Sequence, residues 1–353
     1  MCVSAVVQVT AGASHSCALH ADGTVTCWGL AEAIVRGGAV VLAPFAVAGL
    51  DQPTRLVAGT NRTCAITRLG RVRCWGDQDL SIVKEDGTEL RDVSALALGA
   101  SYGCAANPEG TYCWGQNLRG QLARQLEVQE SAAAVLSAPG PQRFLGAGEA
   151  VVVHDGAGRI CAWGSSATKV VTASDDLGVY TSPQCATLGD VVELTVGEDH
   201  ACVRHAGGTF ACWGERYYGQ LGSGGGDLDT ADVAPYGADT ALGAGVVTLV
   251  AGVSHTCALL ASGTVTCFGR NSLGQVGPGA GTSAEEVRMP AQVTGFSGRV
   301  VALGSGSSAQ HTCAILADGS LECWGSDHAG QLGDGVTTVE DGRRSRGPVR
   351  IRW

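Results

Sequence analysis

One segment recurs along the whole chain and limits the folds available to it. In its first copy, residues 14–29 ("SHSCALHADGTVTCWG"), two cysteines flank an Asp-Gly turn. Similar segments occur at 60–76, 100–115, 148–164, 198–214, 253–269 and 309–325. Their Trp or Phe residues recur at a mean spacing of about 49 residues, so the chain is an array of seven related units.

Each unit has the pattern of four short β-strands. A segment ending in glycine, such as "RLVAG" at 55–59, precedes most hairpins, and proline-led segments, such as "APFAVAGL" at 43–50, lie between several copies. A period of about 40–50 residues with four strands is typical of a β-propeller blade. Alternation with period two disfavours an α-solenoid. The sequence therefore predicts an all-β protein, with residues 1–353 forming a single seven-bladed propeller of four-stranded antiparallel blades.

The two ends of the chain predict how the ring closes. The chain starts inside a unit, with "VVQVTAG" at 6–12, and finishes with the proline-led segment "GPVRI" at 347–351. We expect this C-terminal strand to join the first blade, because such a join removes an open sheet edge.

The cysteine spacing predicts cross-strand disulfides. A three-residue loop, Ala21–Gly23, sets a register in which Cys17 faces Cys27 as a non-hydrogen-bonded pair. Such pairs have Cα atoms about 4.5 Å apart, which a disulfide tolerates. In the third copy the loop is one residue shorter, yet its two cysteines still face each other. The predicted pairs are Cys17–Cys27, Cys64–Cys74, Cys104–Cys113, Cys202–Cys212, Cys257–Cys267 and Cys313–Cys323.

The fourth copy is irregular. It has Val151 in place of the first cysteine, and its Cys161 is displaced by one residue, which turns the side chain to the other face. We expect Cys161 to pair with Cys185, in the proline-led strand counted here with the following unit. Cys2 remains as a free thiol, an intermolecular link or a lipid attachment site.

This cysteine pattern also bears on chemistry and compartment. The spacing lacks the close cysteine pairs of zinc sites and the Cys-x-x-Cys of redox enzymes. Disulfides persist in oxidising compartments. We therefore expect a secreted, periplasmic or cell-surface protein.

Composition excludes some partners. The net charge of −10 disfavours nucleic acid, and the arginine-rich end, 342–353, is interpreted as a solvated edge and strand. No apolar run is long enough to span a membrane, and no signal-peptide pattern opens the chain, so an exported form would be a processed one. The segment "GSGGGDLDTAD" at 222–232 lacks the EF-hand pattern and is interpreted as a loop. We expect a monomer without a cofactor.

Histidines and tryptophans recur at fixed places in the repeat. The tryptophans before each "G" are interpreted as packing residues. Four histidines stand two residues before a cysteine: His15, His200, His255 and His311. Hydrogen bonds to blade backbone are the favoured interpretation, and a metal ring in the central channel is the alternative. Arg62 and Tyr102 in the same slot disfavour the metal.

The motifs "GxxHxCAL", "DGxVxCWG" and "GQLG" (219–222 and 330–333) resemble the regulator of chromosome condensation repeat. The resemblance covers all seven units and implies a seven-bladed propeller with closed termini. The cysteine before the Trp is similar to a disulfide-bearing bacterial branch of that family. The family's functions are mostly protein binding, including nucleotide exchange on a small nuclear GTPase, chromatin docking and inhibition of secreted β-lactamases. The first two fit an acidic, oxidised chain poorly, and no catalytic residue is carried over.

The leading functional hypothesis is a non-enzymatic exported module that binds a protein through loops on one propeller face. The loops after each "WG" carry interface-type residues: Arg119, Arg216, Tyr217, Tyr218, Arg270 and His328. The alternatives are a carbohydrate- or cell-surface-binding propeller, and a lyase or hydrolase with its site at the channel mouth. The sequence shows no Ser/His/Asp arrangement, paired-carboxylate motif or phosphate loop for such an enzyme.

Overall fold

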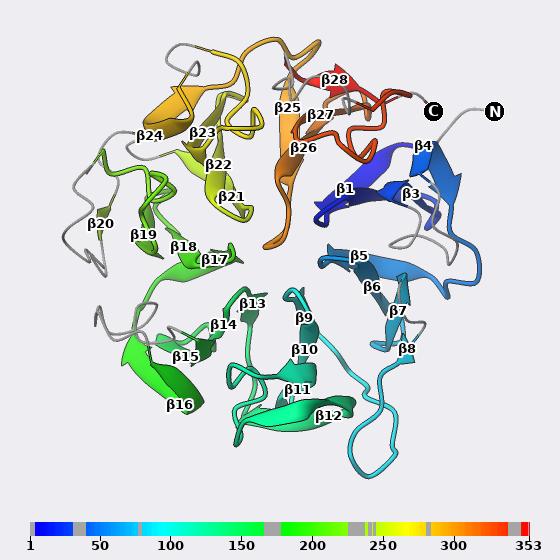
Figure 1. Ribbon diagram of the computed structural model, residues 1–353, viewed down its shortest axis with the longest axis vertical. Coiled ribbons are helices and arrows are strands. Elements are labelled where there is room, and N and C mark those ends of the chain that lie inside the picture. The colour runs from blue at the N-terminus through cyan, green and yellow to red at the C-terminus, as the bar shows by residue number, and fades with distance from the viewer. Residues whose placement is uncertain are drawn as a thin grey trace.

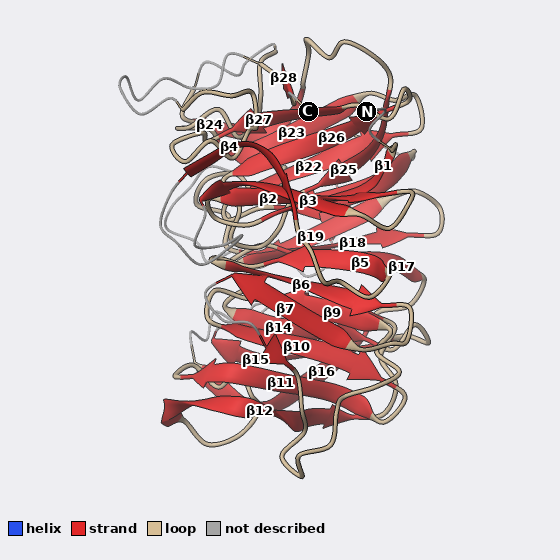
Figure 2. Ribbon diagram, turned by 90° about the vertical axis from the view of Figure 1, so that its right-hand side faces the viewer, coloured by secondary structure: helices blue, strands red, loops and turns tan. Residues whose placement is uncertain are grey.

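Seven four-stranded antiparallel sheets surround a central axis in the computed structural model (Figure 1). The structure describes residues 4–30, 40–76, 80–165, 178–224, 237–238, 242, 245–279, 284–337, 347–351 and 353. From the side the blades form a disc with loops on both faces (Figure 2). Every regular element in the described part is a strand, so the all-β seven-bladed propeller predicted by the repeat is confirmed.

Each blade is built from four strands that are consecutive in the chain. The first, innermost strands are β1 (Val6–Ala11), β5 (Pro53–Ala58), β9 (Ala95–Leu98), β13 (Phe144–Ala147), β17 (Val191–Val196), β21 (Val246–Ala251) and β25 (Val300–Gly304). The second are β2 (His15–His20), β6 (Arg62–Thr67), β10 (Tyr102–Asn107), β14 (Ala150–His154), β18 (His200–His205), β22 (His255–Leu260) and β26 (His311–Leu316).

The remaining strands complete each blade toward its outer edge. The third are β3 (Val25–Leu30), β7 (Val72–Gly76), β11 (Gly110–Asn117), β15 (Arg159–Ser165), β19 (Phe210–Gly214), β23 (Val265–Arg270) and β27 (Leu321–Gly325). The fourth are β4 (Val40–Ala46), β8 (Leu80–Ser81), β12 (Glu127–Pro139), β16 (Val179–Thr187), β20 (Gly237–Ala238), β24 (Glu286–Gln292) and β28 (Val349–Arg350).

The core lies between the blades. The second strands are buried along most of their length; β2, for example, is buried at every position. One face of the first hairpin, with Cys17 and Leu19, packs in one cluster with Leu56 and Trp75 of the second blade. Because both faces of a blade are covered by its neighbours, apolar residues occupy both faces of the hairpin strands.

Seven disulfides are present, and the cysteines are joined in the pairs expected from the sequence. Cys17 and Cys27 are register partners with Cα atoms 4.1 Å apart. In the fourth blade Cys161 is instead the register partner of Cys185. One detail was wrong: Val152, facing Ala162, occupies the first-cysteine position, and Val151 faces Trp163. Cys2 lies outside the described residues.

The predicted closure by the C-terminal strand is wrong. β28 pairs with β27, through Cys323↔Val349 and Glu322↔Arg350, so it is the fourth strand of the seventh blade. The same holds for β4, which pairs with β3 of its own hairpin. The proline-led segment therefore ends a blade rather than beginning the next one. The first blade has four strands of its own, β1 to β4.

Side chains close the ring in place of a shared strand. Val9 and Trp28 of the first blade share one buried cluster with Ile315 and Leu321 of the seventh. The ring of Trp353 stands edge-on to that of Trp28, with centroids 6.3 Å apart. The first and last blades accordingly lie side by side in Figure 1.

Candidate functional site

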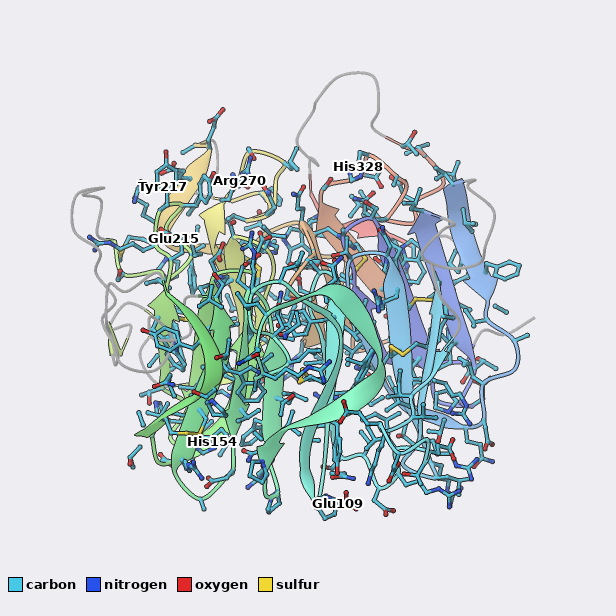
Figure 3. The ribbon with its side chains drawn as sticks, turned by 60° about the horizontal axis from the view of Figure 1, so that its bottom comes forward. Glu109, His154, Glu215, Tyr217, Arg270 and His328 are labelled. Carbon is cyan, nitrogen blue, oxygen red and sulfur yellow. A yellow bond between two sulfur atoms is a disulfide. The ribbon has the colours of Figure 1, made fainter. Side chains whose placement is uncertain are left out.

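The alternation of strand direction sorts the loops onto two faces. Loops that join first to second and third to fourth strands open on one face, and the other connections open on the opposite face. The first face, here called the GQ face, is defined by the Gly-Gln motifs at 120–121, 219–220, 274–275 and 330–331. Figure 3 shows Tyr217, Arg270 and His328 toward this face, with Glu109 and His154 at the other end of the blades.

Each Gly-Gln motif fastens its loop to the next blade. The Trp28 indole N–H donates to the Gln331 main-chain oxygen at 2.8 Å, and Trp163 donates in the same way to Gln121. The glutamine side chain shapes its own loop, as where Gln220 Oε1 accepts the main-chain N–H of Tyr218. The motif is thus structural, and the residues between "WG" and "GQ" are held in fixed positions.

The recurring histidines link neighbouring blades. His15 Nε2 is hydrogen-bonded to Thr63 Oγ1 at 2.8 Å, and His311 Nε2 to Ser16 Oγ at 2.6 Å. The same bond joins His200 to Thr256 and His255 to Thr312. The favoured prediction of bonds to blade backbone was therefore wrong, because the partners are side-chain hydroxyls of the next blade.

Burial keeps these histidines neutral. It lowers the pKa of His15 and His255 to about 4, and the pKa of His200 and His311 to about 3. Within the described ranges, no three His, Cys, Asp or Glu side chains are placed to share a metal ion. The four histidines therefore connect neighbouring blades through hydrogen bonds.

Three of the candidate interface residues form one cluster. The rings of Tyr217 and Tyr218 meet edge to face with centroids 4.7 Å apart. The Arg270 guanidinium, from the following blade, lies 5.0 Å from the centroid of the Tyr218 ring. Tyr217 remains 47% exposed. We call Tyr217, Tyr218 and Arg270 the tyrosine–arginine cluster.

The other three candidates lie apart from this cluster. Arg119 forms an ion pair with Glu149 of the next blade, and its side chain is 55% exposed. His328 Nε2 is hydrogen-bonded to Ser14 Oγ at 3.0 Å across the junction of the last and first blades. Arg216 donates its main-chain N–H to Glu215 Oε1. The six residues share one face but belong to different blade junctions.

Acidic turns lie on the same face. Glu149, Glu198 and Asp199 occupy the first-to-second strand turns of the fourth and fifth blades and line one small hollow. Burial, followed by the nearby Asp199 and Glu149, raises the pKa of Glu198. The face therefore presents negative charge close to Arg119.

Asp327 is the most perturbed carboxyl group of the Gly-Gln loops. Its Oδ1 accepts the main-chain N–H of Leu332, as Asn117 and Asn271 do in their own loops. Its Oδ2 is buried without a hydrogen-bond partner among the described residues. Burial, reinforced by Asp334, raises the pKa of Asp327 to about 7.

The central channel is lined by residues from the first strands of all seven blades and encloses about 310 Å³. Its charged lining residues include Arg55 and Glu193. Glu193 forms an ion pair with Arg204 at 2.8 Å, and burial raises the pKa of the Glu193 carboxyl group. In the part of the chain that the structure describes, no helix has the length and apolarity needed to cross a membrane.

Comparison with known proteins identifies the repeat. A family model, "Regulator of chromosome condensation (RCC1) repeat", matches residues 6–31, 54–80 and 246–275. These ranges coincide with hairpins of three blades. The chain contains RCC1 repeats. One Gly-Gln motif, residues 274–275, lies within the third matched range.

Relatives of this RCC1-repeat chain include much longer proteins. The ultraviolet-B receptor UVR8 of Arabidopsis thaliana is 30% identical over 220 residues, which are 60% of this chain and 48% of UVR8. The human E3 ubiquitin-protein ligase HERC2 is 38% identical over 128 residues, which are 36% of this chain and 2% of HERC2. The chain thus matches about half of UVR8 and a small part of HERC2.

Solved structures share the RCC1-type fold at low sequence identity. Human WBSCR16 superimposes with a TM-score of 0.74 at 19% identity, covering 94% of both chains. Prp20p of Saccharomyces cerevisiae gives a TM-score of 0.52 at 18% identity, covering 98% of this chain and 77% of its own. These likenesses establish the fold alone.

Proposed function

We propose that this RCC1-repeat propeller is a non-enzymatic module that binds a protein partner through its GQ face. The tyrosine–arginine cluster carries the proposal. Tyrosine and arginine are enriched at binding hot spots because they combine a large contact area with hydrogen-bonding groups. Tyr217 is 47% exposed although the cluster is ordered by contacts from two blades.

A preformed cluster favours binding energetically. Tyr217 and Tyr218 are held by main-chain bonds to Glu215 Oε1 and Gln220 Oε1, at 3.0 and 2.9 Å. A partner therefore meets side chains on a fixed loop and does not have to order the loop itself. Arg119 and the acidic turns beside it supply a polar rim typical of interfaces.

Structural relatives are consistent with a binding role. Prp20p of Saccharomyces cerevisiae has binding properties to Gsp1p and histones. We extend to this chain only the general role of protein recognition. The seven disulfides support an oxidising compartment as the place of action, because such bonds are reduced in the cytosol.

The test compares two exposed apolar sites on opposite faces. The purified chain is cross-linked in an extracellular or periplasmic extract, alongside Tyr217→Ala/Tyr218→Ala and Leu69→Ala. Leu69 is 59% exposed and lies in a second-to-third strand turn, on the opposite face. We expect one protein that the wild type and Leu69→Ala capture equally, and that the double variant loses. Equal capture by all three proteins would exclude the tyrosine–arginine cluster as the binding site.

A further inference from the structure

One of the seven disulfides differs from the rest in position and exposure. Six of them join the second and third strands of a blade, and their twelve cysteines are at most 7% exposed. Cys161–Cys185 instead joins β15 to the outermost strand, β16. Cys161 is buried, whereas Cys185 is exposed. Of the two cysteines, only Cys185 is exposed toward an attacking thiol.

A guanidinium group stands beside the exposed sulfur. Arg159 Nη2 lies 3.3 Å from Cys185 Sγ. A hollow of about 440 Å³ opens there, bounded by the turn 155–159 and by Cys185. The Asp155 carboxylate accepts three main-chain N–H groups of the same turn, those of Ala157, Gly158 and Arg159. The turn that carries Arg159 is therefore fixed, and its cation faces the hollow.

We propose that the Cys161–Cys185 disulfide is a thiol-exchange site, where a low-molecular-weight thiol forms a mixed disulfide with Cys185. The entering thiolate attacks Cys185 Sγ, and the electron pair of the protein disulfide leaves on Cys161. The Cys161 thiolate then takes a proton from water. The hollow has room for a thiol of tripeptide size, and the buried hairpin disulfides offer no such approach.

A second thiol completes the exchange. Its thiolate attacks the external sulfur of the mixed disulfide, and Cys185 leaves as a thiolate beside the Arg159 guanidinium. Two thiols are thereby oxidised to one disulfide, and one protein disulfide is reduced. A nearby cation favours the thiolate as leaving group, so Arg159 acts as a positioning residue for the release of Cys185.

The exchange changes one strand and leaves the ring intact. After reduction β16 loses its covalent link to β15 and is held by main-chain hydrogen bonds and side-chain packing, while the other six blades keep their disulfides. The attachment of β16, the outer strand of the fourth blade, then depends on the ratio of thiol to disulfide in the surrounding solution.

The experiment uses the native protein and reduced glutathione as the probe. Samples are quenched with iodoacetamide and mapped by peptide mass spectrometry. We expect the glutathione adduct on Cys185 and the alkyl group on Cys161, at a rate at least about tenfold above that of the six hairpin pairs. A first adduct on Cys161, a first adduct on a hairpin cysteine, or loss of all seven bonds at one rate would overturn the proposal.

Substitution of Arg159 distinguishes the effect of its guanidinium group from the effect of the exposure of Cys185. In Arg159→Gln, we expect the mixed disulfide to form but to release Cys185 several-fold more slowly. In a Cys161→Ser background, the same substitution should move the alkylation of Cys185 to higher pH. Arg91→Gln is the control, because Arg91 is a 63% exposed arginine on another blade. Identical release rates and alkylation profiles in both arginine variants would refute the role of Arg159.

Discussion

The indole N–H of Trp28 and the main-chain oxygen of Gln331, 303 positions apart in the chain, form a 2.8 Å hydrogen bond across the junction of the first and last blades. Trp324 makes the same bond to Gln275 within the ring. His311 to Ser16 likewise repeats the bond of His255 to Thr312. The junction that closes the ring is therefore built like the junction between the sixth and seventh blades.

Removing the N–H of Trp28 should weaken this junction. We expect Trp28→Phe to lower the free energy of unfolding by about 1–2 kcal/mol, because the buried Gln331 oxygen loses its indole donor. Phe268 occupies the equivalent place in the sixth blade, so the ring itself fits. The measurement is urea unfolding followed by circular dichroism, with the disulfides intact.

Trp114→Phe is the matched control for this prediction. The Trp114 Nε1 has no hydrogen-bond partner in the described part of the chain. Its replacement removes no such bond and should cost clearly less than that of Trp28. Equal losses for the two variants would show that the bond to Gln331 contributes nothing to stability.

The buried histidines predict acid sensitivity. Burial holds the pKa of His255 at about 4, below the ordinary value of 6.5. Between these pH values the unfolded chain binds a proton that the folded chain does not, so stability falls as pH falls through this window. Each histidine contributes up to about 1.4 kcal/mol per pH unit. Urea unfolding of His255→Gln at pH 7, 6 and 5 should give a shallower decline than the wild type, and parallel declines would contradict this account.

Asp327 predicts a pH effect of opposite sign. Its pKa is raised to about 7 from 3.8, so between these values the folded chain binds the extra proton and stability falls as pH rises. Asparagine occupies this place in two other loops, where Asn117 Nδ2 donates to the Gln125 oxygen at 2.7 Å. We expect Asp327→Asn to stabilise the protein by about 1–2 kcal/mol at pH 8 and to have little effect near pH 4. Thermal unfolding at the two pH values checks this, and a gain at pH 4 alone would refute it.

A glycine three residues before His15, His200 and His255 provides room for the imidazole ring. A Cβ on Gly252 would lie 2.1 Å from His255 Cε1 and 2.6 Å from the Ala309 oxygen. We expect Gly252→Ala to cost about 3 kcal/mol, as overpacking in a well-packed site does. Gly189→Ala is the control, because a Cβ there meets no atom within 4 Å. A denaturant midpoint shared by the two variants would argue against this close fit.

The local geometry of each hairpin was predictable from the sequence, but the blade to which each proline-led strand belongs was not. The register of Cys17 with Cys27 follows from a three-residue turn and the period of a strand, both contained in one segment. Nothing in a repeated sequence marks where one blade ends and the next begins, so the proline-led strand could be assigned to either neighbouring hairpin. That ambiguity produced the wrong closure.

The partners of the histidines were missed although the sequence carries a signal for them. A hydroxyl residue follows the histidine slot wherever the preceding blade has a histidine: Ser16, Thr63, Thr256 and Thr312. After blades with Arg62, Tyr102 or Ala150 in that slot, the corresponding residues are Gly103, Val151 and Ala201. The pairing lies about one repeat apart, so it appears only when adjacent copies are compared. The exposure of Cys185 was hidden for a similar reason, since it depends on which strand is outermost.

Because each blade is built from four consecutive strands of its own, no strand pairing between the described ends of the chain fixes the number of blades. Duplication or loss of one unit would leave every sheet whole and would change only the angle between neighbours. A chain of this design can therefore gain or lose a blade during evolution by recombination between copies, provided that the histidine–hydroxyl and Trp–Gln contacts of the adjoining units still match.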